Sequence, residues 1–281
     1  MDVRADAGRW PAQQRGVGPR ETRAIVRTVA HRPWPLPRGP WVNAQSWLDL
    51  LFAHWPLDPE RVRPLVPAPL ELDLYEGRAW IGVVPFLLAG FRARLLPPIP
   101  GTAVFPEVNV RTYVRHGGKA GVWFFSLDAA SRLAVHGARL AFGLPYFHAD
   151  MAIDRNGGWI RYASRRRGGG DEAALACRYR PTGAPFEPAP GTLEHFLVER
   201  YALFALRRGR LVRGEIHHRP WTLRAAEAEI ARATLVRAAG IELPDAPPLA
   251  HVAARQDSLI WPPRAEARCA RRPAGPAWIE E

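Results

Sequence analysis

The sequence lacks the residues on which several classes of protein depend. Its two cysteines, Cys177 and Cys269, are too few and too far apart for a disulfide framework or a zinc-binding pattern. No apolar run reaches the roughly 18 residues that a membrane span needs, and the N-terminus has no apolar signal segment. We therefore expect a protein of the reducing cytoplasm with no membrane partner.

Lysine is also scarce, since Lys119 is the only lysine among the 39 basic residues. A lysine that forms a Schiff base must be neutral near pH 7, which requires burial or a neighbouring cation. Lys119 lies in the Gly-rich segment 117–121, the predicted tip of a hairpin, where we expect it to be solvated and protonated. The sequence therefore argues against decarboxylation through an imine.

A net charge of +12 would suit a nucleic-acid-binding protein, but the distribution of the charge argues otherwise. The arginines concentrate in residues 4–38, 165–167 and 264–272, and the chain uses Ala, Pro and Gly heavily. This pattern indicates a genome-wide bias in composition. We expect no specific nucleic-acid partner, and nonspecific binding through the Arg-rich ends is a third hypothesis for function.

Composition divides the chain into one domain and two ends. Residues 1–40 are rich in Arg, Pro and Gly and lack apolar periodicity, so we expect a disordered extension. Residues 41–263 contain enough apolar residues for one core, and residues 264–281 are expected to form a tail.

Short apolar segments alternate with turn signals between residues 41 and 263. Strands are predicted at 47–55, 70–75 with 79–86, 105–114 with 122–127, 146–153 with 159–163, 174–179, 203–207 with 211–217, and 249–254 with 258–261. Short helices are predicted after Asp58, within 128–142, after Thr192 and from about residue 231. Many short strands with few helices predict a mainly β protein, either a β-barrel or a β-sandwich.

The most informative stretch is 105–148. In its first strand the polar residues Glu107, Asn109, Arg111 and Tyr113 alternate with three valines and a threonine, which predicts a half-buried strand. The polar side chains then project from one face about 7 Å apart. This row is either a solvated face of the sheet or the wall of a polar pocket, and the residues alone leave both open.

Several motifs resemble those of the YqjF-like family of uncharacterised bacterial proteins. They are Phe-Ala-His-Trp-Pro at 52–56, Phe-Pro-Glu-Val-Asn-Val-Arg-Thr-Tyr-Val at 105–114, Gly-Val-Trp-Phe-Phe-Ser-Leu-Asp-Ala at 121–129, Gly-Leu-Pro-Tyr-Phe-His at 143–148 and His-His-Arg-Pro-Trp at 217–221. The resemblance covers about residues 47–262. That family is similar to a distant branch of the acetoacetate decarboxylase superfamily, which implies a curved antiparallel β-barrel around a small cavity, with a few short peripheral helices.

The resemblance also bears on chemistry. The decarboxylases of the superfamily carry a glutamate on one strand and, further on, Gly-aromatic-Pro-Lys-Lys, whose first lysine forms the Schiff base. Glu107 is similar to the first feature and residues 143–145 to the start of the second. Tyr146 and Phe147 stand where the two lysines would be, so the resemblance implies the fold without the imine chemistry.

Glu107, Tyr146 and His148 are the candidate catalytic residues. Tyr146 and His148 alternate on one predicted strand, and a Tyr–His–Glu set could transfer protons because histidine titrates near neutral pH. The competing interpretation of His148 is a buried histidine bonded to a backbone carbonyl.

Asn109, Arg111, Ser126 and His218 are the candidate ligand-binding residues. Arg111 could hold a carboxylate through two parallel hydrogen bonds, with Glu107 about 13 Å away along the strand as an acid or base. Asn109 lies between them and would complete the polar lining. Alternatively, Glu107 and Arg111 are surface charges or take part in structural hydrogen bonds.

Two functional hypotheses therefore stand beside nucleic-acid binding. The first is a barrel that binds a small anionic or carbonyl-containing molecule, with any chemistry being acid–base. The second is a non-enzymatic ligand-binding or structural protein of the same fold. No residue spacing is typical of a metal site, so we expect neither a metal nor a cofactor. The sequence leaves open whether there is turnover and whether the chain forms homo-oligomers.

Overall fold

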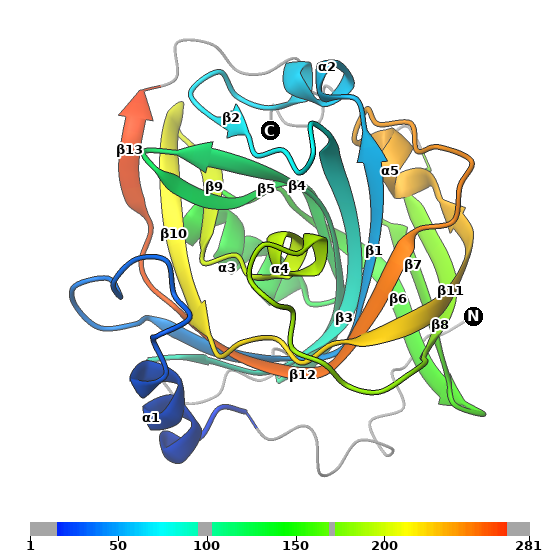
Figure 1. Cartoon of the computed structure of the whole chain (residues 1–281), viewed down its shortest axis with the longest axis horizontal. Coiled ribbons are helices and arrows are strands. Elements are labelled where there is room, and N and C mark those ends of the chain that lie inside the picture. Colours follow the sequence, from blue (N-terminus) through cyan, green and yellow to red (C-terminus); the bar gives the residue numbers. More distant parts are fainter. Residues whose placement is uncertain (1–15, 95–102, 169–171, 269–281) are drawn as a thin grey trace.

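One strongly curved sheet contains the thirteen strands of the described residues (Figure 1). The computed structural model describes residues 16–94, 103–168 and 172–268. The strands are β1 (Asn43–Leu57), β2 (Glu71–Leu72), β3 (Ala79–Ala93), β4 (Val104–His116), β5 (Lys119–Ala129), β6 (Tyr146–Asn156), β7 (Trp159–Arg166), β8 (Ala174–Pro181), β9 (Ala202–Arg207), β10 (Arg210–His218), β11 (Arg224–Ala233), β12 (Leu249–Ile260) and β13 (Arg264–Arg268).

The sheet branches and does not form one simple closed barrel. The strand order is β13-β10-β9-β5-β6-β7-β8-β11-β12-β1-β3-β4-β2, and β4 also pairs with β5 while β10 also pairs with β12. Successive pairings therefore run β1–β3–β4–β5–β9–β10–β12 and return to β1. In Figure 1 these strands curve around a common centre, and β6, β7, β8 and β11 extend to one side. The predicted curved, mainly β architecture is confirmed in this branched form.

Short helices accompany the sheet. They are α1 (Pro19–Arg27), α2 (Pro59–Val62) with the 3-10 helix η2 (Arg63–Leu65), α3 (Arg132–Phe142), α4 (Leu193–Val198) and α5 (Thr234–Ala238). Because β5 and β6 are parallel, the chain needs a crossover between them, and α3 supplies it. The side chain of Ser131 caps the start of α3, and Gly143 ends it in the left-handed conformation at φ 70°.

Most of the predicted local pairings are confirmed. The hairpins β4–β5, β6–β7 and β9–β10 form where turn residues separate the apolar segments. The helix predicted after Thr192 is α4, and the Thr192 hydroxyl accepts a hydrogen bond from the His195 amide. The ambiguous segment 221–239 is first the strand β11 and then the helix α5. These features depend on neighbours in the sequence, which is why local patterns identify them.

Two predicted hairpins are wrong. The chain does turn at Glu76-Gly77, but only Tyr75 and Arg78 bridge across that turn, and β2 pairs with β4. β12 is one continuous strand where the sequence predicts a turn within residues 255–257. It remains extended because it pairs with β1 from Leu249 to Ile260.

A bulge in β5 decides which of its side chains face which side. Val110 pairs with Ser126, whereas the next residue, Arg111, pairs with Phe124, so Phe125 is an extra residue. A bulge of one residue reverses the alternation of the strand that contains it. As a result β4 keeps its predicted alternation, while Ser126 is placed beside Val110 and away from Arg111.

Two core clusters lie on the two faces of the β4–β5 hairpin. Val110 and Phe125 belong to a cluster that also contains residues of β6, β7 and β8. Phe124 and Leu127 belong to a second cluster, together with residues of β1, β3, β9 and β10. The row of polar β4 side chains faces this second cluster, so it does not lie on a solvated face of the sheet.

The folded part of the chain begins before residue 41, where the sequence predicts the domain to start. In α1, Ile25 is 1% exposed and packs in a cluster with Leu259 and Trp261. At the other end, 264–268 was predicted to be tail but forms β13, which pairs with β10. Residues 1–15 and 269–281 lie outside the described residues. Residues 16–40 are therefore not the disordered extension that the sequence predicts, and the prediction fails because α1 buries only one apolar residue, Ile25.

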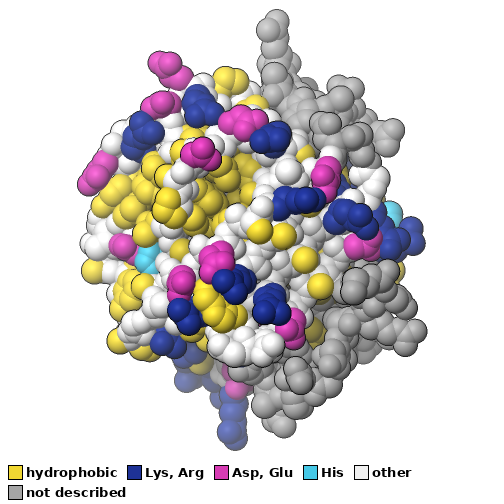
Figure 2. Space-filling view, turned by 90° about the vertical axis from the view of Figure 1, so that its right-hand side faces the viewer, with side chains coloured by type: hydrophobic (Ala, Val, Ile, Leu, Met, Phe, Trp, Pro, Cys, Tyr) yellow, Lys and Arg dark blue, Asp and Glu magenta, His cyan; other side chains and the backbone are white. Residues whose placement is uncertain are grey.

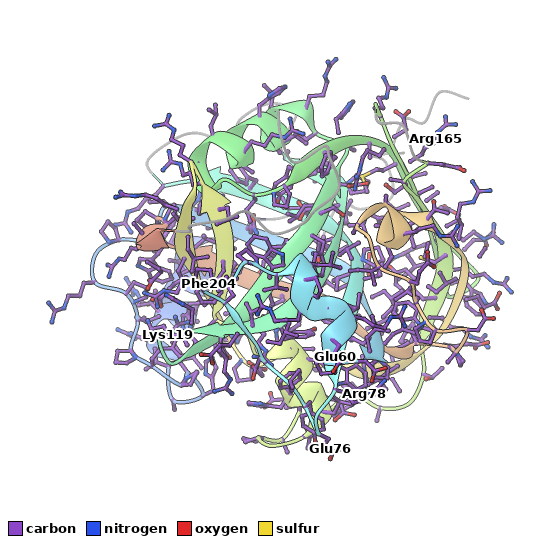
Figure 3. The ribbon with its side chains drawn as sticks, turned by 90° about the horizontal axis from the view of Figure 1, so that it is seen from above. Glu60, Glu76, Arg78, Lys119, Arg165 and Phe204 are labelled. Carbon is purple, nitrogen blue, oxygen red and sulfur yellow. The ribbon has the colours of Figure 1, made fainter. Side chains whose placement is uncertain are left out.

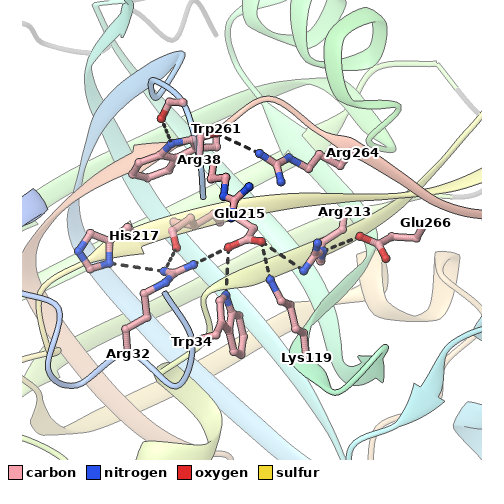
Figure 4. A network of polar contacts seen from close by, with 12 residues as sticks. Arg32, Trp34, Arg38, Lys119, Arg213, Glu215, His217, Trp261, Arg264 and Glu266 are labelled. Atoms are coloured by element: carbon pink, nitrogen blue, oxygen red, sulfur yellow. Dashed lines mark hydrogen bonds and ion pairs between the residues drawn. The ribbon is translucent and has the colours of Figure 1, made fainter. Parts of the chain in front are cut away.

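Glu215 of β10 connects this N-terminal segment to the sheet (Figure 4). Its carboxylate accepts hydrogen bonds from Arg32 at 2.7 Å, Trp34 at 3.0 Å and Lys119 at 2.8 Å, and it forms an ion pair with Arg213 at 3.2 Å. Burial opposes the ionisation of Glu215, but the hydrogen bonds and the nearby cations keep its pKa below the ordinary value. Lys119 is therefore an ion-paired residue with a 26% exposed side chain, not the solvated turn residue that the sequence predicts.

We predict that Arg32→Ala lowers the free energy of unfolding by about 2–4 kcal/mol, because it removes one cation from a buried carboxylate. Chemical denaturation followed by tryptophan fluorescence checks this value. Arg23→Ala, on the exposed side of α1, is the matched control and should change the stability by less than about 0.5 kcal/mol. Equal effects of the two substitutions would show that Glu215 does not hold this segment.

Candidate functional site

A cavity of about 140 Å³ lies beside the polar row of β4. Glu107, Asn109 and Arg111 line it, as do Tyr146 at the start of β6 and His218 at the end of β10. Five of the seven predicted site residues therefore meet in one place. Most of the remaining lining is apolar and includes Trp47, Leu50, Phe52, Val84, Phe86, Phe124, Leu127, Phe142, Leu144 and Trp221.

The other two predicted site residues do not reach this cavity. Ser126 is fully buried beside Val110 because of the bulge in β5. His148 lines a separate surface groove with Asp150 and Arg165, because β6 leaves β5 after residue 148 and pairs with β7. The predicted Tyr–His–Glu set is therefore not assembled.

The structure also places polar residues in the cavity that the sequence did not reveal. Asn43 and Gln45 come from the first residues of β1, before the strand start predicted at 47. Arg200 follows α4 and is joined to the buried Asp73 by an ion pair. Arg200 follows no periodic pattern, and its partner is 127 residues away in the sequence, so no local signal indicates it.

Glu107 and Tyr146 form a buried acid pair. The Tyr146 hydroxyl lies 3.2 Å from both carboxyl oxygens of Glu107, which is 3% exposed. Burial raises the pKa of Glu107 to about 8, and the charge of Asp128 adds to this effect while the hydrogen bond from Tyr146 opposes it. Burial, followed by the charge of Glu107, raises the pKa of Tyr146 well above its ordinary value. Near pH 7 the pair is therefore mostly neutral and can donate a hydrogen bond or a proton.

Arg111 carries a positive charge at the other end of the polar row. One of its terminal nitrogens donates to the Tyr113 hydroxyl at 3.4 Å and to the Leu197 carbonyl at 3.3 Å, and its Nε is buried without a partner. The guanidinium also lies 5.4 Å from the ring centroid of Phe52. Within the described ranges Arg111 forms no ion pair, in contrast to Arg200. Arg111 is half-buried, so its guanidinium is partly removed from water without a counter-charge, and an anion in the cavity would compensate for this loss.

Two residues of adjacent strands, His54 and Gly82, lie next to Arg111. His54 of β1, Gly82 of β3 and Arg111 of β4 lie side by side in register. The Nε2 of His54 is hydrogen-bonded to the Tyr113 hydroxyl at 2.7 Å, and His54 is 1% exposed. Burial, followed by the charge of Arg111, keeps the pKa of His54 well below its ordinary value, so this imidazole is neutral.

Gly82 leaves the space that this arrangement needs. A β-carbon at this position would lie 3.0 Å from His54 Nε2 and 3.3 Å from Arg111 Cγ. Both distances are shorter than comfortable contacts, so any larger residue would push the two side chains apart. The absence of a side chain at Gly82 thus allows His54 and Arg111 to lie across β3.

The described parts of the chain contain no group of three or more His, Cys, Asp and Glu side chains arranged to hold a metal ion. No helix in those parts is long and apolar enough to cross a membrane. The cavity presents carboxyl, phenol, guanidinium, amide and imidazole groups.

Comparison with known proteins identifies the family. The model of the DUF2071 family, described as "Uncharacterized conserved protein", matches residues 44–257. The chain belongs to this family. It is 52% identical over 229 residues to the uncharacterized protein YqjF of Bacillus subtilis, covering 82% of this chain and 94% of YqjF. Residues 44–257, which the family model matches, include all of β4 and the cavity residues contributed by β6 and β10.

Solved structures show the same fold at low sequence identity. The enduracididine biosynthesis enzyme MppR, in complex with the condensation product of pyruvate and imidazole 4-carboxaldehyde, has a TM-score of 0.58 at 13% identity, covering 83% of this chain and 91% of MppR. An acetoacetate decarboxylase from Legionella pneumophila has a TM-score of 0.55 at 15% identity, covering 87% and 96%. The DUF2071 chain thus has the acetoacetate decarboxylase-like fold that the resemblance implies.

We predict that Gly82→Ala destabilises the protein by about 1–3 kcal/mol, because the added methyl group overpacks His54 and Arg111. Replacing a glycine by alanine in regular structure normally stabilises it by up to about 1 kcal/mol. Gly137→Ala in α3 is the matched control, since a β-carbon there meets no atom within 4 Å. Thermal unfolding checks both variants, and a stabilising effect of Gly82→Ala would contradict the proposed crowding.

Proposed function

We propose that the DUF2071 chain binds a small molecule with a carboxylate or carbonyl group in the cavity lined by Glu107, Arg111 and Tyr146. The observation that carries this proposal is Arg111, a cation at the cavity that forms no ion pair within the described residues. A carboxylate can accept two parallel hydrogen bonds from a guanidinium, and this arrangement would satisfy the unpartnered Nε.

Acid–base chemistry is the chemistry that these groups support. The neutral Glu107 can donate a proton to a ligand carbonyl or enolate, and after ionisation it can take the proton back. Tyr146 holds the carboxyl group in place through its hydroxyl. Asn109, between Glu107 and Arg111 on the same face of β4, offers an amide to a ligand that spans the two.

An imine mechanism has no support from the residues of the cavity. The only lysine of the sequence, Lys119, is paired with Glu215 and does not line the cavity. Figure 3 places Lys119 at the outer end of the β4–β5 hairpin. Tyr146 occupies the position at which the resemblance to the decarboxylases would put the lysine, and a phenol cannot form a Schiff base.

A non-enzymatic binding protein is the alternative. His148 lies outside the cavity, so the predicted catalytic set loses the group that titrates near neutral pH and Glu107 is left as the candidate for proton transfer. This loss favours binding without turnover. Nucleic-acid binding has less support, because exposed arginines of β8 are paired with acidic residues of β11, Arg178 with Glu229 and Arg180 with Glu227. Basic and acidic side chains are also intermingled on the face shown in Figure 2. We propose a cytoplasmic location together with this function, because the scarcity of cysteine is typical of proteins in a reducing compartment.

We predict that Arg111→Met abolishes the stabilisation of the protein by small carboxylates. At a concentration ten times its dissociation constant, a ligand that binds only the folded chain adds about 1.4 kcal/mol to the stability. Thermal unfolding with acetoacetate, pyruvate and benzoate as probes should show this gain for the wild type and none for Arg111→Met.

Arg161→Met, which removes an exposed arginine of β7, is the matched control and should retain the wild-type response. Glu107→Gln should still bind the probes but lose any turnover, and binding without turnover in the wild type would favour the non-enzymatic alternative. An equal response of Arg111→Met and the wild type to all three probes would refute the proposal.

A further inference from the structure

We infer that the ligand is a monocarboxylate whose body is flat, unsaturated and about the size of one benzene ring. This inference rests on the proposed function and adds the size, the charge and the shape of the molecule. Each of these three properties follows from a different feature of the cavity.

The volume of the cavity limits the size of the ligand. An apolar cavity of roughly 150 Å³ in another protein holds a benzene molecule, and the cavity of this chain measures about 140 Å³. A single ring therefore fits, with its carboxylate placed at Arg111. Fused rings or long acyl chains would exceed this space and would have to project from its open side.

The charges at the cavity indicate a single negative charge on the ligand. Arg111 is the cavity arginine without an ion-pair partner among the described residues, whereas Arg200 is ion-paired with Asp73, a carboxylate that it shares with Arg115. Glu107 is mostly protonated near pH 7, so it does not neutralise Arg111 either. A second carboxylate on the ligand would meet no further cavity arginine that lacks an ion pair within the described residues, so its burial would weaken binding.

The aromatic wall indicates a flat body. The rings of Trp47 and Trp221 are stacked, with centroids 5.9 Å apart and planes 10° apart. Phe52 packs edge-on against Trp221 at 4.9 Å and 85°, and Arg111 lies over the ring of Phe52. The wall therefore extends from the cation across three rings, all of which line the cavity. A ligand anchored at Arg111 would lie against this wall.

Flat rings gain more from such a wall than saturated rings of similar size. Aromatic pairs contribute about 0.5–1.5 kcal/mol beyond the area that they bury. Converted into affinity, this range corresponds to a preference of roughly twofold to tenfold for a flat ring over a saturated one. The preference can be measured because the two kinds of ring share the same charge.

The test is isothermal titration calorimetry of the full-length protein with four probes. Benzoate is flat and anionic, cyclohexanecarboxylate is anionic and not flat, benzamide is flat and neutral, and terephthalate carries two charges. We expect benzoate to bind about twofold to tenfold tighter than cyclohexanecarboxylate. We expect benzamide and terephthalate to bind at least about tenfold more weakly than benzoate.

Variants of the wall show whether it causes the preference. Trp47→Leu should bring the affinity ratio of benzoate to cyclohexanecarboxylate close to one, while Trp47→Phe, which keeps a flat ring, should retain part of it. Circular dichroism and the thermal midpoint verify that both variants are folded. Because the result is a ratio measured on one sample, a general loss of stability does not imitate it.

The outcomes separate this inference from the proposed function. Equal affinities for benzoate and cyclohexanecarboxylate would overturn the flat body and leave carboxylate binding intact. Tight binding of terephthalate would overturn the single charge. If neither monocarboxylate binds, the proposed function itself fails together with this inference.

Discussion

The cavity depends on β4, which places the half-buried Arg111 and the buried Glu107 on one face of the sheet. Both side chains project from the same face of β4 and line the cavity. Burial raises the pKa of Glu107 to about 8, so this carboxyl group is mostly protonated and neutral near pH 7. A guanidinium stays charged at this pH. Arg111 therefore stays charged at the cavity with no ion-pair partner among the described residues, and the neighbouring His54 is kept neutral by its own burial and by that charge.

The sheet around the cavity is built to keep these groups in place. Gly82 makes room for His54 and Arg111 between β1 and β4, and the bulge at Phe125 turns Phe124 and Leu127 together toward the cavity. α3 connects β5 to the parallel strand β6, and Tyr146 at the start of β6 lies within hydrogen-bonding distance of Glu107. Glu215 does not line the cavity. Its hydrogen bonds and ion pairs join the N-terminal segment to β10, so polar contacts hold this segment in the folded domain.

The sequence predicted the parts of the fold and of the site that depend on local patterns. The alternation of Glu107, Asn109 and Arg111 needs only one strand and was sufficient to place all three on one face. The exclusion of Ser126 and His148 could not be predicted, because it follows from a bulge and from a change of partner between strands. The pairing of Arg32 with Glu215 spans 183 residues, and no local pattern contains such a contact.

The most direct test of an anionic ligand is a measurement of the pKa of Glu107. The protein can be labelled with 13C at the glutamate side-chain carboxyl groups, and the signal of Glu107 identified by its absence in Glu107→Gln. A pH titration followed by NMR should show this signal changing with a midpoint near pH 8, as burial beside Tyr146 requires. A midpoint near the ordinary value of 4.5 would show an ionised carboxylate in the cavity. The cavity would then have no net positive charge, which would contradict the assignment of an anionic ligand.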